Sequence, residues 1–283
     1  MAIIGKRNRL AVVRDAPPGI YLDDGGRGEI LLPGRYIPRG VAPGDMLDVF
    51  VYLDSEDRLV ATTETPLAMV GEFACLKVVS VNRQIGAFLD WGLSKDLLLP
   101  FREQVGKVGV GQSVVVFVHL DSRTSRIVAS MRLNQHLSRI PPSYVEGQPV
   151  RLIIIGKTPL GYSAMVEHAH RGLLYDSNLS GPLKIGQAIR GFVHAVRPDG
   201  KIDLRLDASG YQKVFPLREQ ILQALERNGR RLEFDDKSPP QAIREAFGVS
   251  KNTFKLALSA LYKERRIRFQ NGGTELVDIA PSR

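Results

Sequence analysis

The chain has 283 residues, of which 43% are hydrophobic and 24% charged, and this composition is typical of an ordinary globular protein rather than a membrane protein. No apolar run approaches the ~20 residues of a membrane helix, the first residues lack the apolar core of a signal peptide, and a single cysteine, Cys75, excludes an internal disulfide. We therefore expect a cytoplasmic protein. The net charge of +9 favours a polyanionic partner, either nucleic acid or an anionic membrane surface.

Three segments repeat one pattern of glycines and apolar residues without insertion or deletion. Each begins with a glycine, at Gly19, Gly86 and Gly161. A leucine pair, a second glycine and a phenylalanine then follow at shared offsets: Leu31-Leu32, Leu98-Leu99 and Leu173-Leu174; Gly44, Gly111 and Gly186; Phe50, Phe117 and Phe192. Short alternating apolar runs broken by Gly, Pro and Asp predict about five strands per repeat.

Five strands with a sharply bent first hairpin indicate an OB-fold, a small closed barrel in which the first glycine lets a strand bend. We predict a mostly β protein with a C-terminal α+β module: three tandem OB-fold barrels, then a winged helix-turn-helix. The predicted domains are residues 1–65, 66–133, 145–206 and 214–283. The polar segment from Asn134 to Ser143 reads as a linker between repeats two and three, whereas repeats one and two should dock closely.

The second repeat, with "VNRQIGAFLDWG", "DLLLPFREQ" and "GQSVVVFVHLDSRTSRIVAS", resembles the S1 RNA-binding domain. The resemblance implies RNA contacts from Phe88 and from Asp121 with Arg126, and we include Arg123 between them. The sequence departs from the S1 pattern where Ile85 and Pro100 replace an aromatic residue and a histidine.

Other aromatic residues can complete an RNA-binding surface. Trp91 either offers a replacement stacking surface or packs against its barrel, and the sequence leaves both open. In the third repeat, we predict that Tyr162 and Tyr175 contact RNA, because Tyr175 aligns with Pro100 and would lie on the sheet face that OB-folds use for oligonucleotides.

The basic excess is unevenly distributed. Residues 1–65 carry a net charge of −2, whereas residues 66–133, 145–206 and 214–283 carry +3, +3 and +4. Since Lys and Arg that replace counterions supply much of the affinity for nucleic acid, repeats two and three and the C-terminal module are the expected contact regions.

Helical spacing begins after Leu206. The first predicted helix has one apolar stripe, formed by Leu217, Ile221, Leu222 and Leu225. Ser238 is the predicted N-cap of a second helix and Ser250 that of a third. The third helix should bury Phe254, Leu258, Leu261 and Tyr262. Two strands around an Asn-Gly turn complete a winged helix-turn-helix.

In winged helices the start of the third helix commonly faces nucleic acid. The candidate contacts there are Lys251, Asn252 and Lys255, and those in the hairpin are Arg266 and Arg268.

Three OB repeats followed by "FDDKSPPQAIREAFGVSKNTFKLALSALYKERRI" resemble the CvfB family of bacterial proteins (conserved virulence factor B, or YitL-like) over the whole chain. The resemblance implies a cytoplasmic RNA-binding regulator of gene expression. We expect single-stranded RNA as the partner, with weak sequence preference. A DNA-binding transcriptional regulator, an adaptor on ribosomes or ribonucleases, and a homodimer remain open.

Nothing in the sequence predicts an enzyme, a cofactor or a metal site. His168 and His170 would face the same side of a strand, but only Glu167 lies near to complete a metal site. Cys75 lies in a strand-like run and is expected to act as a small hydrophobic residue.

Overall fold

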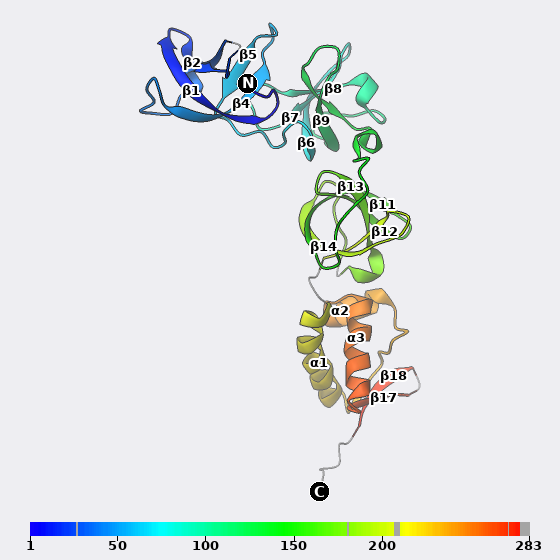
Figure 1. Cartoon of the computed structure of the whole chain (residues 1–283). Coiled ribbons are helices and arrows are strands. Elements are labelled where there is room, and N and C mark those ends of the chain that lie inside the picture. The colour runs from blue at the N-terminus through cyan, green and yellow to red at the C-terminus, as the bar shows by residue number, and fades with distance from the viewer. Residues whose placement is uncertain (27, 180, 207–209, 271, 278–283) are drawn as a thin grey trace. The chain divides into compact units, whose positions relative to one another are not determined.

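The computed structural model describes residues 1–26, 28–179, 181–206, 210–270 and 272–277. The chain divides into two compact units, Met1–Leu137 and Ser138–Arg283. The first unit contains two closed β-barrels, and the second contains a third barrel and a helical module (Figure 1). Among the described residues, no helix combines the length and apolarity that crossing a membrane requires.

All three barrels share one strand order. The first consists of β1 (Arg7–Ala16), β2 (Gly19–Asp23), β3 (Glu29–Pro33), β4 (Met46–Leu53) and β5 (Leu59–Thr62). The second consists of β6 (Phe73–Asn82), β7 (Gly86–Asp90), β8 (Leu97–Pro100), β9 (Ser113–Leu120) and β10 (Ile127–Ser130), and the third of β11 (Pro149–Thr158), β12 (Gly161–Val166), β13 (His170–Tyr175), β14 (Ala188–Val196) and β15 (Ile202–Arg205). In each barrel the third strand pairs in parallel with the fifth, and the first pairs with the fourth. This is the OB-fold order, so the predicted fold class is confirmed.

The first glycine of each repeat is required by a close approach between the second and third strands. Gly86 has φ +139° and pairs with Pro100, and a Cβ at Gly86 would lie 2.3 Å from the carbonyl oxygen of Leu99. The equivalent distances are 2.1 Å at Gly19 and 2.0 Å at Gly161. Any side chain would collide with the neighbouring backbone, which explains the repeated glycine at this bend.

Strand β4 is buried on both faces and joins the first two barrels. Val49 and Val51 pack in the core of the first barrel, whereas Phe50 and Tyr52 pack in the core of the second. The Phe50 ring meets the edge of Trp91, with centroids 5.7 Å apart and an interplanar angle of 81°. The close docking expected from the short connection is therefore observed.

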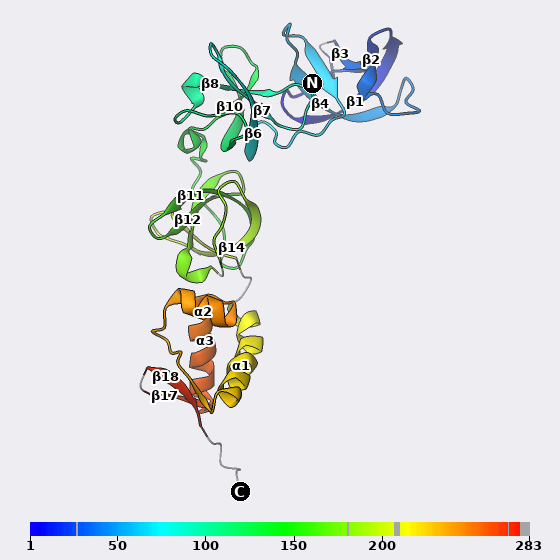
Figure 2. The same ribbon diagram turned by 180° about the vertical axis from the view of Figure 1, so that it is seen from behind.

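The C-terminal module has the elements of a winged helix. They are α1 (Gly210–Arg227), β16 (Arg231–Leu232), α2 (Pro240–Phe247), α3 (Lys251–Lys263), β17 (Ile267–Gln270) and β18 (Gly273–Leu276). α1 and α3 lie side by side in both views (Figure 1, Figure 2). Their core contains the predicted stripe of α1 together with Phe254, Leu258 and Leu261 of α3. Asn271, in the predicted Asn-Gly turn, lies outside the described residues.

Two details of the module differ from the prediction. The N-cap of α2 is Pro239, because the Ser238 hydroxyl accepts instead from the backbone N–H of Asp235 at 2.9 Å. Tyr262 is 55% exposed, since it lies in the last turn of α3, where the hairpin rather than α1 is its neighbour. Ser250 caps α3 as predicted, accepting from the Thr253 N–H at 3.2 Å.

Within the second unit, the third barrel contacts the winged helix through a short 3-10 helix, η4 (Asp176–Asn178). Arg244 of α2 donates from Nη2 to the carbonyl oxygen of Asp176 at 2.6 Å, and α3 also lies against η4.

Candidate nucleic-acid interface

Phe88 is half-buried at the centre of the outer face of β6, β7 and β8. It pairs with Ser80 on β6 and with Leu98 on β8, while the neighbouring Leu89 fills the barrel core. Strand alternation therefore turns the Phe88 side chain away from the core and onto the face that OB-folds use for oligonucleotides.

Two exposed apolar side chains, which the sequence analysis did not select, lie at the end of the same hairpin. Ile85 is 46% exposed and Phe101 is 47% exposed, and the Phe101 N–H donates to the Ile85 carbonyl at 3.3 Å. Phe101 begins η2 (Phe101–Glu103), directly after β8. An exposed aromatic ring thus lies next in sequence to β8 and is tied through its backbone to Ile85, where the usual S1 aromatic residue is missing.

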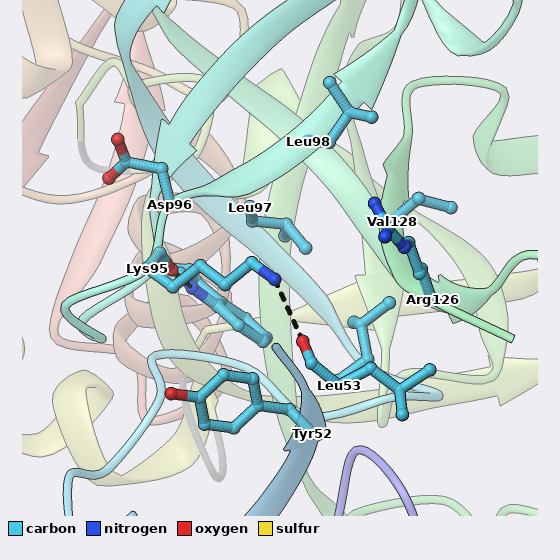
Figure 3. Close-up of a pocket in the computed structure, with 10 residues that line it drawn as sticks. Tyr52, Leu53, Lys95, Asp96, Leu97, Leu98, Arg126 and Val128 are labelled. Carbon is cyan, nitrogen blue, oxygen red and sulfur yellow. Dashed lines mark hydrogen bonds between the residues drawn. The ribbon is translucent and has the colours of Figure 1, made fainter. Parts of the chain in front are cut away.

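Trp91 does not offer a stacking surface, which corrects that part of the prediction. It is 3% exposed, its Nε1 donates to the Lys95 carbonyl at 2.5 Å, and its ring meets Phe50 of the first barrel. Trp91 forms part of a pocket at the junction of the first two barrels (Figure 3). There Lys95 donates from Nζ to the carbonyl of Leu53 at 2.9 Å, and burial lowers the pKa of Lys95.

Asp121 and Arg126, which the S1 resemblance assigns to RNA, both have structural partners within the first unit. Asp121 is buried; its Oδ1 accepts from the N–H groups of Arg123 at 2.9 Å and Thr124 at 3.1 Å, and Oδ2 accepts from Arg102. These donors, the Arg123 N–H first, hold the pKa of Asp121 below its usual range. Arg126 donates to Asp57 of the first barrel at 2.7 Å. The side chain of Arg123 is exposed on the same turn.

Tyr162 in the third barrel is buried in the core, so its prediction as a surface residue is corrected. Its ring lies under Lys157, whose Nζ is 4.0 Å from the ring centroid. Tyr175 is half-buried at the end of β13, and its hydroxyl donates to Asp203 Oδ1 at 3.2 Å and accepts from Arg197. These bonds fix the Tyr175 ring on the outer face while leaving part of it accessible.

The start of α3 carries three predicted contact residues, two of which have partners within the module. Lys251 donates from Nζ to the carbonyl of Lys237 at 3.1 Å, and Lys255 Nζ lies 3.9 Å from Asp236. Asn252 is exposed. Polar ends held this way can still contact phosphate, but they are less free to read bases.

The hairpin presents an aromatic pair that the sequence analysis missed. Tyr262 and Phe269, which is 43% exposed, stack with centroids 5.5 Å apart and an interplanar angle of 23°. Arg268 is exposed beside them and bonds to Glu275, with 2.9 Å between Nη2 and Oε2, whereas Arg266 is half-buried. Strand alternation with the buried Ile267 would put Phe269 on the core side, but Phe269 is exposed beside Tyr262.

His170 has hydrogen-bond partners at both ring nitrogens, so it is not available as a metal ligand. Nδ1 lies 2.9 Å from the Tyr144 hydroxyl and Nε2 lies 2.8 Å from the Ile140 carbonyl oxygen.

Comparison with known families agrees with this architecture. The S1 domain model matches residues 4–64 and 70–132, and the CvfB-like winged helix domain model matches residues 219–276. Protein YitL of Bacillus subtilis is 28% identical, with coverage of 95% of this chain and 92% of its own. Conserved virulence factor B of Staphylococcus aureus strain N315 is 24% identical, and the match covers 85% of this chain and 82% of that protein. The chain is therefore similar to the CvfB family over most of its length.

A solved structure from Streptococcus pneumoniae, described as a multidomain protein with nucleic acid binding domains, is 23% identical to this chain. The match covers 97% of this chain and 98% of the solved chain, with a TM-score of 0.41. S1 and winged-helix domains are nucleic-acid-binding domain types, and this chain combines both.

Proposed function

We propose that this chain is a cytoplasmic protein that binds single-stranded RNA with weak sequence preference and regulates gene expression after transcription. The contacts come from the outer faces of the second and third barrels and from the winged helix. The first barrel is a scaffold, because its β4 strand is covered by the second barrel and its charge is net negative.

The observation that carries this proposal is the exposure of aromatic rings on an OB face. Phe88 is half-buried on the outer face of β7, and Phe101 is exposed in η2, directly after β8. Bases stack on such rings with little regard to their identity, and they can do so only when they are not already stacked and paired in a duplex. The exposed rings therefore favour a single strand over a duplex.

The charge pattern supports the same partner. The exposed Arg123 lies at a turn of the second barrel, and the two later regions carry net charges of +3 and +4. These cations provide phosphate contacts along a strand whose bases stack on the rings, a combination common to non-specific single-strand binders.

The arrangement of α3 disfavours insertion into a DNA groove. α3 lies against η4 of the third barrel, and Lys251 and Lys255 at its start are held by groups of the module. A recognition helix needs its first turn free for base edges. In this proposal Lys251, Lys255, Arg266 and Arg268 contact phosphates.

The proposal is tested by comparing Phe88→Ala with Val105→Ala in the full chain. Val105 is exposed on a loop of the same barrel, so its truncation removes apolar surface outside the proposed site. Loss of one stacking platform should weaken binding of a fluorescent single-stranded RNA roughly 5- to 150-fold, whereas Val105→Ala should leave it unchanged. Equal affinities of the two variants would contradict a role for this face.

A further inference from the structure

Three side chains from separate parts of the second barrel converge at one place. His119 lies on β9, Glu103 ends η2, and His136 ends η3 (Leu133–His136), which follows the barrel. One ligand atom from each lies within 4.8 Å of the other two. They are 16 or more positions apart in sequence, so no short sequence motif predicts that they lie together.

The two imidazoles are left in an unusual state. Nε2 of His119 and Nε2 of His136 are both buried, and neither has a hydrogen-bond partner within the described part of the chain. A buried polar atom without a partner destabilises a protein by about 1–3 kcal/mol, so two side by side need an explanation.

The surrounding contacts suit a metal ligand. An N–H at Nδ1 of His119 donates to the Leu120 carbonyl at 3.2 Å, which leaves the lone pair on Nε2. Histidines that bind metals commonly donate their second ring nitrogen to a backbone carbonyl in this way.

The site is also held in shape by its neighbours. The Phe117 ring stacks on His136 with centroids 4.4 Å apart and on His119 at 6.4 Å. The Glu103 carbonyl accepts from the Met131 N–H at 2.8 Å, which ties η2 to the segment that leads into η3. Both imidazoles and the helical turn that bears Glu103 are thus positioned by the barrel itself.

From this geometry we propose that Glu103, His119 and His136 bind a divalent transition-metal ion, with zinc the best match. Two imidazole nitrogens and one carboxylate form a ligand set that zinc accepts with a fourth position left for water or another ligand. Tetrahedral bonds of about 2.0–2.2 Å would place the ligand atoms about 3.4 Å apart, so small side-chain rotations suffice to close the present spacing. The ion would hold η2 and η3 against β9. Because Phe101 belongs to η2, the ion would also fix the position of this exposed residue.

The test uses the full chain without an affinity tag, freed of metal by chelation and then dialysed against zinc chloride. Wild-type protein should retain about one zinc ion per chain by elemental analysis, and cobalt chloride should produce the visible absorption of tetrahedral Co²⁺. Glu103→Gln and His136→Gln should each weaken zinc binding by more than about tenfold. His194→Gln is the matched control, because His194 is exposed on β14 of the third barrel.

Two results would overturn the proposal. One is wild-type protein that retains no zinc, which would mean that Glu103, His119 and His136 only pack against one another. The other is unchanged affinity in Glu103→Gln and His136→Gln, which would place the bound metal elsewhere. Circular dichroism verifies that each variant folds, and if His136→Gln does not, Glu103→Gln carries the test alone.

Discussion

Arg126 Nε donates to Asp57 Oδ1 at 2.7 Å and thereby joins the second barrel to the first. Asp57 has φ +61° in the turn between β4 and β5, and the hydrogen bond from Arg126 lowers its pKa. The same guanidinium donates to the Ser55 carbonyl at 3.3 Å. A residue that the S1 resemblance assigns to RNA is occupied with docking the barrels, whereas the neighbouring Arg123 extends into solvent.

Arg123 and Arg126 should consequently respond differently to substitution. Arg123→Ala is expected to weaken binding of single-stranded RNA and to reduce the slope of log affinity against log salt by about 1, because it removes one phosphate contact. Arg126→Ala should leave that slope unchanged and lower the thermal stability of the first unit slightly. Fluorescence anisotropy titrations at several salt concentrations measure the slope. A reduced slope in Arg126→Ala would show that Arg126 contacts RNA, as the S1 resemblance implies.

Trp91 provides a direct optical test of the barrel junction, since it is the only tryptophan in the chain. Its burial against Phe50 predicts emission at short wavelength, weak quenching by acrylamide, and no change when RNA is added. Trp91→Ala should destabilise the first unit by about 3–5 kcal/mol, as expected for a large buried aromatic residue. Strong quenching on RNA addition would show that Trp91 does stack with bases.

The repeats and the winged helix could be predicted because their signals are local. The spacing of Gly19, Gly86 and Gly161 reflects a bend within one hairpin, and the stripe of α1 reflects one helix face. Exposure is different, because it depends on segments distant in sequence. Trp91 is covered by Phe50 of another repeat, and Tyr262 is uncovered because its neighbour is a hairpin. No local pattern distinguishes these two outcomes.

The stacked pair Tyr262 and Phe269 is predicted to contribute to RNA binding. Tyr262→Ala and Phe269→Ala should each weaken binding of single-stranded RNA, by roughly 5- to 150-fold if a base stacks on the pair. The combined variant should lose less than the product of the two effects, because both rings form one platform. Leu256→Ala is the control, since Leu256 is exposed on α3 outside the pair. Variants that bind as tightly as this control would exclude the platform.

Asp121 predicts a pH dependence of stability. The folded-state pKa of Asp121 is lowered, first by the Arg123 N–H, so its stabilisation is complete above the unfolded pKa of about 3.9 and is lost as the pH falls below that value. The difference in unfolding free energy between wild type and Asp121→Asn should be constant above about pH 5 and should shrink below about pH 4. Urea unfolding at each pH measures it, and a difference independent of pH would contradict the assigned role.

The central claim is that the chain binds single strands of RNA rather than a DNA duplex. The most direct measurement compares the affinities of the full chain for a single-stranded RNA and for a duplex DNA of equal length at equal salt concentration. The account predicts tighter binding of the single-stranded RNA, a loss of that preference in Phe88→Ala, and a steep salt dependence from the basic regions. Much tighter binding of the duplex DNA, unchanged in Phe88→Ala, would contradict it.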